Sequence, residues 1–403
     1  MDPEVARRLV SEEGTQALAA AAAQADPGSL SAATALRKRF DPALAAAALA
    51  QEALRRRAAT KFGDSARRLF LTPDGLEQAT RPDVARWRAE RMVAAGVRRV
   101  LDLGCGIGTD ALAMAAVGLD VVAVDRDETA AVLAAANLAR HGERREGIGP
   151  ATVRHADATA VDLEDRTVFC DPARRTGAGR TWQIGDFSPP WEFVTGLLAR
   201  AEGACLKLGP GLPHRLIPPN TLTEWVSHNG DLVEACIWSS ALADGRVGRA
   251  ARLLPNRGEL RVDPEAPDPP VGDPQRYLHE PEPGVLASGA LPTLAAMTGA
   301  ARVHPEIAYL TTDTPVDSPF WTTFEIRDSF PWREKDLRRW VGEHAIGTLE
   351  IKKRGIDVDP AALRRRLRPK GPGRATIVIT PTLGRAQVLV VERVDAPARD
   401  GSG

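Results

Sequence analysis

Three glycines within five residues follow a short apolar run in the segment VLDLGCGIGTD, residues 100–110. Glycine is costly in a folded chain unless the backbone must turn tightly or lie close to another group. The apolar run predicts a strand, and the residues after the glycines predict a helix whose N-terminus would face a bound ligand. Gly104, Gly106 and Gly108 therefore predict a loop that lies directly against a small molecule.

The spacing of these glycines separates two classes of cofactor loop. Dinucleotide-binding loops follow G-x-G-x-x-G, but Thr109 stands where the third glycine would be. An acidic residue followed by G-x-G-x-G resembles the first motif of class I S-adenosylmethionine (SAM)-dependent methyltransferases, whose loop wraps the methionine and ribose of SAM. The resemblance implies SAM as cofactor, and a plain tight turn is the alternative. The implied cofactor contacts come from Asp102, Gly104, Cys105, Gly106 and Gly108.

Two aspartates after later predicted strands extend this resemblance. Asp125 ends the second strand, where the family carries a carboxylate that accepts hydrogen bonds from both ribose hydroxyls. Asp157 follows the third strand, at the place of the residue that reads the adenine amino group. The alternatives are a strand-end turn for Asp125 and a helix cap for Asp157.

The segment FCDPARR, residues 169–175, ends the fourth predicted strand, where enzymes of this family place the methyl acceptor. Amino-methyltransferases carry Asp or Asn, two prolines and an aromatic residue there, whereas this chain continues with Ala173 and Arg174. The segment looks more like the Asp-Pro-Pro-Arg of RNA uracil methyltransferases, but their nucleophilic cysteine in a Ser-Cys-Asn-Pro context is absent from the sequence. The acceptor atom stays open, and Asp171 and Pro172 are the expected catalytic contacts.

Other residues near that strand end are candidates for acceptor contacts. Lys207 ends the fifth predicted strand, in a chain with 7 lysines and 46 arginines, and is expected to face the same rim as a third catalytic residue; a solvated lysine at a strand end is the alternative. Arg174 and Arg175 could hold a phosphate through paired donors, or form ordinary surface ion pairs. The segment SPPW, residues 188–191, is similar to the acceptor motif of trimethylguanosine synthase but is interpreted as a helix cap with prolines in the first turn.

Helical and strand-like segments alternate in an order that would bring these residues together. The first part of the chain predicts helices, with Asp41-Pro42 and Pro82 at helix starts and Gly96 as a stop. Six β-rich runs then alternate with helices, which predicts a doubly wound α/β sheet. Asp244-Gly245, between LVEACIWSS and GRAARLLP, predicts a closing hairpin with an antiparallel last strand. The resemblance implies a Rossmann-like, seven-stranded methyltransferase sheet.

Composition divides the chain into four parts. A helical N-terminal domain is expected over residues 1–95 and the methyltransferase domain over residues 96–258. Prolines in VDPEAPDPPVGDP predict a linker over residues 259–280. Residues 281–403 predict a smaller α+β domain that closes with a strand, a helix and a strand.

Positive charge gathers near the C-terminus, although the whole chain has 53 basic and 53 acidic residues. Residues 333–374 carry 13 Lys or Arg and 6 Asp or Glu, which favours a nucleic-acid partner; arginines scattered over the surface by coding bias are the alternative. LEIKKRGIDVDPAALRRRLRPKG resembles the THUMP-like domain of a family of bacterial methyltransferases, and true THUMP domains bind RNA. Phosphate contacts are expected from Lys352, Lys353, Arg354, Arg364, Arg365, Arg366, Arg368 and Lys370.

Length and composition limit the class of protein. A chain of 403 residues with 43% hydrophobic content predicts a globular protein of two or three domains. No apolar run approaches the ~20 residues of a membrane span, so a cytoplasmic location is expected. Four scattered cysteines indicate neither a zinc site nor a disulfide framework. The sequence predicts a SAM-dependent methyltransferase that acts on a tRNA or rRNA base; the alternatives are a protein or metabolite substrate, or SAM binding without catalysis.

Overall fold

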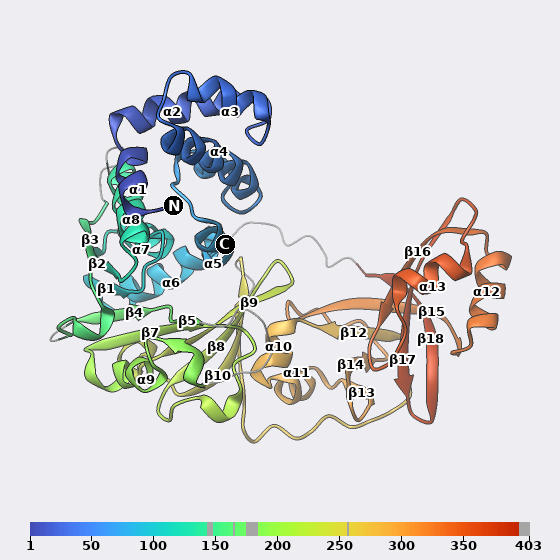
Figure 1. Cartoon of the computed structure of the whole chain (residues 1–403). Helices are drawn as coiled ribbons and strands as arrows, with labels where there is room; N and C mark the ends of the chain where they lie inside the picture. Colours follow the sequence, from blue (N-terminus) through green and yellow to red (C-terminus); the bar gives the residue numbers. More distant parts are fainter. Residues whose placement is uncertain (143–147, 164–165, 175–183, 256–257, 395–403) are drawn as a thin grey trace, which may run out of the picture. The chain divides into compact units, whose positions relative to one another are not determined.

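Two units of structure make up the chain (Figure 1). The computed structural model describes residues 1–142, 148–163, 166–174, 184–255 and 258–394. The first unit contains Met1–Thr223 and Glu234–Gly248, and the second contains Glu224–Val233 and Arg249–Gly403.

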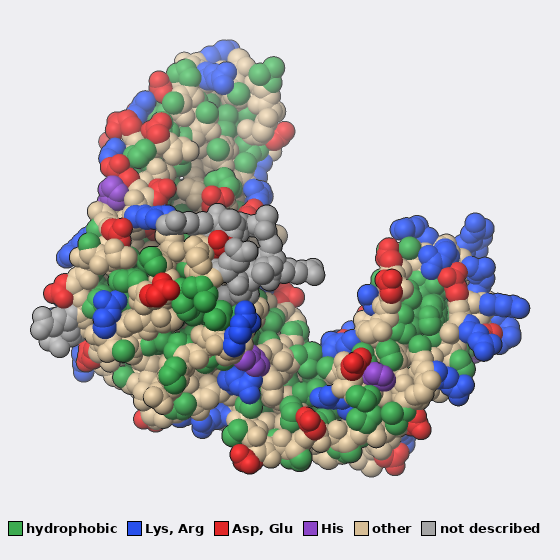
Figure 2. Space-filling model, turned by 60° about the horizontal axis from the view of Figure 1, so that its bottom comes forward, with side chains coloured by type: hydrophobic (Ala, Val, Ile, Leu, Met, Phe, Trp, Pro, Cys, Tyr) green, Lys and Arg blue, Asp and Glu red, His purple; other side chains and the backbone are tan. Residues whose placement is uncertain are grey.

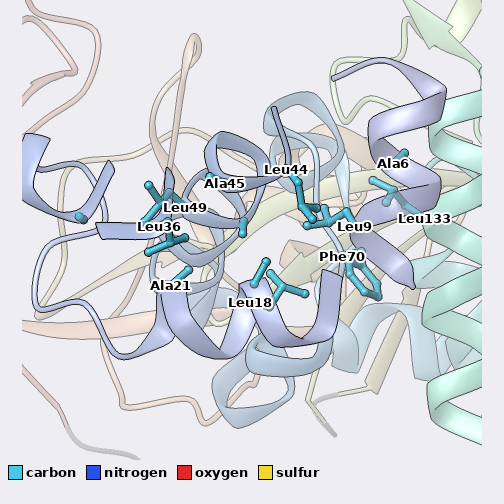
Figure 3. Close-up of a cluster of buried hydrophobic side chains, with 13 residues drawn as sticks. Ala6, Leu9, Leu18, Ala21, Leu36, Leu44, Ala45, Leu49, Phe70 and Leu133 are labelled. Carbon is cyan, nitrogen blue, oxygen red and sulfur yellow. The ribbon is translucent and has the colours of Figure 1, made fainter. Parts of the chain in front are cut away.

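Helices alone form the first part of the first unit. At the predicted Asp41-Pro42 start, the Asp41 carboxylate accepts hydrogen bonds from the N–H groups of Ala43 and Leu44 at 3.0 and 3.3 Å. The apolar faces of these helices share a core with Leu133 on the later helix α8 (Glu128–Gly142) (Figure 3). The helices are α1 (Pro3–Val10), α2 (Glu12–Ala22), α3 (Leu30–Arg37), α4 (Pro42–Phe62), the 3-10 helix η1 (Gly63–Arg68), α5 (Pro73–Gln78) and α6 (Pro82–Ala94).

A nine-stranded sheet has the order β11-β10-β8-β9-β7-β4-β1-β2-β3. The pairs β2–β3, β1–β2, β1–β4 and β4–β7 are parallel, and β9 runs antiparallel to β7. The predicted Rossmann-like sheet of seven strands is confirmed from β3 to β8, and β10 and β11 extend it. The strands are β1 (Arg99–Leu103), β2 (Asp120–Asp125), β3 (Ala151–His155), β4 (Thr167–Cys170), β7 (Gly203–Leu208), β8 (Leu222–His228), β9 (Asp231–Trp238), β10 (Gly248–Leu254) and β11 (Gly258–Arg261).

Helices and short elements follow the strand ends of this sheet. Because neighbouring parallel strands end at the same edge, the residues after β1, β2, β3, β4 and β7 meet there. The connecting elements are α7 (Thr109–Ala116), α8, η2 (Ala158–Ala160), β5 (Ala173–Arg174), η3 (Ile184–Asp186), β6 (Phe187–Ser188), α9 (Trp191–Arg200), η4 (His214–Leu216) and η5 (Ser240–Ala243).

The antiparallel hairpin lies one strand earlier than predicted. The prediction joined β9 to β10 through Asp244-Gly245, but β10 lies between β8 and β11, and Asp244 instead ends η5 in the left-handed conformation. The true turn is Asn229-Gly230, with φ values of 53° and 86°, between β8 and β9. Asn-Gly is the preferred two-residue hairpin turn. The error arose because β8, with its polar sequence LTEWVSH, was not recognised as a strand, although all seven residues are buried.

A seven-stranded sheet forms the core of the second unit, in the order β13-β14-β12-β15-β18-β17-β16. β16 and β17 are parallel, as a strand, helix and strand unit requires, and apolar residues of α12 and α13 pack on β16, β17 and β18. The elements are β12 (Tyr277–Pro281), α10 (Pro283–Ser288), α11 (Leu291–Thr298), β13 (Ala301–His304), β14 (Ile307–Thr312), β15 (Trp321–Pro331), α12 (Glu334–Glu343), β16 (Ile346–Lys353), α13 (Pro360–Leu367), β17 (Gly373–Thr382) and β18 (Arg385–Arg393).

The linker predicted over residues 259–280 contains parts of two strands. β11 ends at Arg261 and β12 begins at Tyr277. Between them, the only β-contact among the described residues is a bridge from Val271 to Arg302. The domain boundaries stay predictions.

Candidate active site

The glycine loop crosses the carboxyl edge of the sheet between β1 and α7. Gly104 and Gly108 have φ values of 87° and 81°, which favour glycine. A Cβ added to Gly108 would lie 3.1 Å from the Cβ of Ala134 on α8, so a side chain at this position would push the glycine loop away from α8. The N–H groups of Gly104 and Cys105 donate to the carbonyl of Val124 at 2.8 and 3.0 Å, which fixes the loop beside β2.

A cavity of about 400 Å³ opens beside this loop. Its volume falls within the roughly 300–1,000 Å³ that is typical of small-molecule sites. Gly108, Pro172 and Lys207 do not border it. Four of the predicted residues that border the cavity are aspartates. The cavity therefore offers oxygen acceptors to a ligand with several donors. The predicted residues in its lining are Asp102, Gly104, Cys105, Gly106, Asp125, Asp157 and Asp171.

Asp102 on β1 is the most deeply buried of these carboxyl groups. It has no solvent exposure, and neither oxygen has a hydrogen-bond donor within the described part of the chain. Burial, followed by the nearby carboxylates of Asp110 and Asp171, raises the pKa of Asp102 well above its usual range. A buried carboxyl group in this situation requires a donor from a ligand or a proton of its own.

Asp125 and Asp157 stand at neighbouring strand ends with different local contacts. One oxygen of Asp125 accepts from the N–H of Gly106 and the other from that of Asp127, both at 2.8 Å, while burial raises the pKa of Asp125. Asp157 is exposed and caps η2, accepting from the hydroxyl and the N–H of Thr159 at 2.7 and 2.8 Å, bonds that lower its pKa. The helix cap foreseen as an alternative is therefore present, on a residue that also borders the cavity.

Asp171 and Lys207 meet at the ends of β4 and β7. The Nζ of Lys207 forms an ion pair with the Asp171 carboxylate and lies 3.5 Å from the main-chain carbonyl of Gln78. Burial opposes the charge on Lys207, but the carboxylates of Asp171 and Asp110 outweigh it and raise the pKa of the amine. Lys207 is therefore a cation that contacts the cavity through Asp171, and the buried Pro172 follows directly.

Helix α5 also lines the cavity, which the sequence analysis did not predict. Gly75, Gln78 and Ala79 border it. A Cβ added to Gly75 would lie 2.7 Å from the Cγ2 of Ile107 in the glycine loop, so glycine permits this close approach. The Nζ of Lys61 donates to two carbonyls at the end of α5, at 2.9 and 3.3 Å. The segment TPDG marked a helix start, but no local signal placed that helix against the cavity.

Ser188, Pro189 and Pro190 line the cavity as well, so the interpretation of SPPW as a helix cap was wrong. Ser188 belongs to β6 and pairs with Ala173 in β5, two residues after Asp171. Helix α9 begins only after Pro190, and no side chain caps it. The two prolines form part of the cavity wall rather than the first helical turn.

Asp110 connects the cavity to a buried charge network that sequence reasoning also missed. Its carboxylate accepts from Nη1 of Arg88 on α6 at 2.9 Å and from the hydroxyl of Thr80 at 2.8 Å. Nη2 of Arg88 lies 3.0 Å from Oε1 of Glu234, and its guanidinium lies 4.7 Å from the ring centroid of Phe169. Arg88 and Glu234 are only 2% and 3% exposed, so one cation serves two carboxylates away from water.

The two arginines expected beside the acceptor are only partly described. The main chain of Arg174 forms β5, and its side chain lies outside the described residues. Arg175 lies entirely outside them.

Most of the basic residues predicted on the second unit have partners within the protein. Lys352 pairs with Glu280 at 2.6 Å, and Nη2 of Arg366 lies 3.0 Å from Oε2 of Glu334. The remaining contacts are those of Arg364 with the carbonyl of Leu349 at 2.8 Å, of Lys353 with the carbonyl of Ile356 at 3.3 Å, and of Arg354 with the ring of Tyr309 at 5.1 Å from its centroid.

A hollow of about 720 Å³ on α12 and α13 is bordered by three of the predicted residues, Arg365, Arg366 and Arg368, but not by Arg364 or Lys370. Figure 2 shows basic side chains gathered on this end of the second unit. Lys352, Lys353 and Arg354 do not border the hollow. Its lining residues are Arg338, Ala362, Arg365, Arg366, Leu367 and Arg368.

Three family descriptions match parts of the chain. The description "methyltransferase domain" matches residues 100–170, which contain the glycine loop. "THUMP domain-like" matches residues 321–393, and a domain of unknown function (DUF8688) matches residues 2–58.

Curated relatives extend the match to most of the chain. Uncharacterized SAM-dependent methyltransferases from two strains of Mycobacterium tuberculosis are each 32% identical over 337 residues, which cover 81% of this chain and 90% of the relative. This chain belongs to the SAM-dependent methyltransferases. The methyltransferase also shares its fold with the crystal structure of a presumed methyltransferase from Porphyromonas gingivalis W83, at a TM-score of 0.73 and 20% identity, over 95% of this chain and 99% of that one.

Among the described residues of the methyltransferase, no helix combines the length and the apolar character needed to cross a membrane. In the same part of the chain, no three His, Cys, Asp or Glu side chains are grouped so that they could hold a metal ion.

Proposed function

We propose that the methyltransferase transfers a methyl group from SAM to a base of RNA. The observation that carries the RNA part is the arginine-lined hollow within the THUMP-like region. Guanidinium groups hold phosphates through paired N–H donors, and about half or more of the hydrogen bonds between proteins and nucleic acids go to the backbone. A phosphate of RNA is therefore the proposed occupant. The four arginines are Arg338, Arg365, Arg366 and Arg368.

Each carboxyl group assigned to SAM is matched with the hydrogen-bond donor of SAM that it could accept from. Following the family resemblance, Asp125 would accept from the ribose hydroxyls and Asp157 from the adenine amino group. The ammonium of the methionine part is then the donor left for Asp102, whose oxygens have no other partner among the described residues. This orphaned carboxyl group and the bare backbone at Gly106, which borders the cavity, are the features that fit SAM.

Asp171 is proposed to hold the methyl acceptor. SAM supplies a methyl group on a positively charged sulfur, which is already an activated electrophile. The protein must therefore orient the acceptor and receive a hydrogen bond from it. Asp171 borders the cavity; burial raises its pKa, and the ion pair with the ammonium of Lys207 opposes that rise and holds the carboxylate in place.

Two prolines in the cavity wall favour an acceptor that donates hydrogen bonds. These are Pro189 and Pro190, whereas Pro172, directly after Asp171, is buried and does not border the cavity. Proline has a carbonyl but no N–H, so this rim offers acceptors and few donors. An amino or ring N–H group of a base would suit such a rim better than a carboxylate.

The proposal is tested by methylating cellular fractions from a strain that lacks the gene, with the purified enzyme and SAM labelled in its methyl group. We expect label in RNA that nuclease removes, and mass spectrometry of the nucleosides would identify the base. Label in protein or in a small metabolite would show that this molecule, and not RNA, is the substrate. A protein that binds SAM and labels no fraction would support binding without catalysis.

Asp125→Ala is expected to weaken SAM binding roughly 10- to 150-fold, which corresponds to about 1.5–3 kcal/mol for a lost hydrogen bond to a charged group. Calorimetric titration measures the affinity. Asp127→Asn is the matched control, because Asp127 is exposed, caps α8 and does not border the cavity. Unchanged affinity for SAM in Asp125→Ala would show that this carboxylate does not bind the cofactor.

Reversing Arg338, Arg365 and Arg368 together to glutamate is expected to weaken binding to all RNAs. It should also flatten the log–log salt dependence by about 2 units, at roughly 0.7 per phosphate contact on a single strand. Arg366 is left in place because it donates to Glu334 through both Nε and Nη2, whereas Arg338 meets Glu334 through Nη2 alone. Filter binding at several salt concentrations measures both quantities.

The matched control for this triple variant is the reversal of Arg37, Lys38 and Arg39, three exposed basic residues around the end of α3. It changes the net charge equally, so a general electrostatic effect would appear in both variants. SAM affinity serves as the check on folding. If the two triple variants bind RNA alike, the arginine-lined hollow is not the RNA site.

A further inference from the structure

Asp102 differs from the other carboxyl groups of the cavity in having no donor at all within the described residues. Asp125 accepts two main-chain N–H bonds, and Asp171 has the ammonium of Lys207. Asp110 has the guanidinium of Arg88. Asp102 is completely buried and belongs to the lining of the cavity.

The charged groups that face Asp102 do not compensate a negative charge on it. Three carboxylates surround it: Asp110 on α7, Asp171 after β4 and Asp125 on β2. The cation that acts on it is Arg88 on α6, whose donors already serve two other carboxylates.

Two thiols complete the surroundings of Asp102. Cys105 in the glycine loop and Cys170 on β4 are both buried, and burial raises the pKa of each thiol well above its usual range. Neither group supplies a positive charge. An ionised carboxylate at Asp102 would therefore be buried among like charges without a donor, which favours the protonated form in the empty cavity.

We propose that Asp102 gives up its proton when the ammonium of the methionine part of SAM binds beside it. The empty site holds Asp102 as a carboxylic acid, and the occupied site holds a carboxylate against the ammonium. One proton passes to the solvent, and no covalent bond forms. The inference rests on the assignment of Asp102 within the cofactor site and not on RNA as substrate, so the RNA proposal can fail without it.

The ligands of this enzyme class provide a direct test of which group displaces the proton. SAM and its thioether product S-adenosylhomocysteine both carry the ammonium, whereas 5′-methylthioadenosine has the same nucleoside without the amino-acid part. Proton release should accompany the first two ligands and be absent with the third. The positive sulfur is excluded as the cause if the neutral thioether product releases the proton as well.

Calorimetric titration near pH 6 in phosphate, MES and imidazole buffers measures the release, because the observed enthalpy varies with the ionisation enthalpy of the buffer. We expect close to one proton released for SAM and for S-adenosylhomocysteine. Their affinities should then rise by up to tenfold per pH unit, while the affinity for 5′-methylthioadenosine stays constant. A buffer-independent enthalpy for SAM together with a constant affinity from pH 5 to 8 would overturn the proposal, as would equal release with 5′-methylthioadenosine.

Asp102→Asn removes the titrating group and keeps the shape of the side chain. This variant should bind SAM more weakly and without proton release, while its affinity for 5′-methylthioadenosine shows that the cavity has folded. Asp127→Asn should retain the release of the parent enzyme. Release that persists in Asp102→Asn would assign the proton to another group and refute the inference.

Stability without ligand provides a second measurement. The folded-state pKa of Asp102 is raised above the roughly 3.9 of an unfolded chain, so the group lowers stability progressively as pH rises above that value. The Asp102→Asn variant has no such group and does not lose this stability as the pH rises. Its melting temperature should therefore exceed that of the parent by a margin that grows from pH 4 to pH 7. A margin that shrinks over this range would contradict a protonated Asp102.

Discussion

Replacing Asp171 with alanine is expected to slow methyl transfer by at least about 100-fold, while SAM affinity changes by only a few-fold. A group that orients an acceptor and receives its proton contributes typically about 10²–10⁴ in rate. Asp171 borders the cavity at the end of β4, where it forms an ion pair with Lys207. Single-turnover methylation of the identified substrate measures the chemical step, and calorimetry measures SAM binding.

A double variant separates the loss of chemistry from an electrostatic disturbance. Asp171→Ala leaves the ammonium of Lys207 without its carboxylate, which could by itself distort the site. Asp171→Asn combined with Lys207→Met removes both charges and should be as slow as Asp171→Ala. If Asp171→Ala retains a rate near that of the parent enzyme, the acceptor is held elsewhere, and Ser188 in the cavity wall becomes the first candidate.

The features that sequence reasoning predicted correctly are those set by neighbouring residues. The apolar run before Gly104 forms β1, and the residues after Gly108 form α7, because strand, turn and helix preferences act over a few positions. The order of the strand ends then brings Asp102, Asp125 and Asp171 to one cavity. Their roles toward SAM and the acceptor stay predictions.

The hairpin shows how a local signal can be present and still be missed. Asn229-Gly230 is a hairpin signal of the same kind as Asp244-Gly245, but the strand before it is rich in polar residues and so does not predict a strand. One of these, Glu224, is completely buried and pairs with Arg252 on β10. Such pairing lets polar residues form a buried strand, and hydrophobicity alone does not reveal it.

Contacts between distant residues could not be predicted from one sequence. Gly75 approaches Ile107, and Lys61 binds the end of α5, but nothing near these residues marks them as part of a cavity. Likewise, a count of basic residues gives Lys352 the same weight as Arg365. The structure separates them, because Lys352 pairs with Glu280 whereas Arg365 borders the hollow.

Replacing Arg88 with methionine is expected to lower the free energy of unfolding by about 3–5 kcal/mol, the usual range when one partner of a buried ion pair is removed. Arg88 is 2% exposed and holds Asp110 and Glu234, so its loss leaves two buried carboxylates without their cation. Urea denaturation, compared at equal m-values, measures the change. Arg86→Met on the same helix is the control, because Arg86 is exposed and its loss should change stability by no more than about 0.5 kcal/mol.

A triple variant tests whether the cost comes from unpaired charge rather than from lost packing against Phe169. Arg88→Met combined with Asp110→Asn and Glu234→Gln removes every charge of the network and should recover most of the lost stability, because neutral buried groups need no cation. If the triple variant remains as unstable as Arg88→Met, the side chain acts mainly by packing. If Arg88→Met loses less than about 1 kcal/mol, water or rearranged neighbours can replace the guanidinium, and the network is not what fixes Asp110 at the cavity.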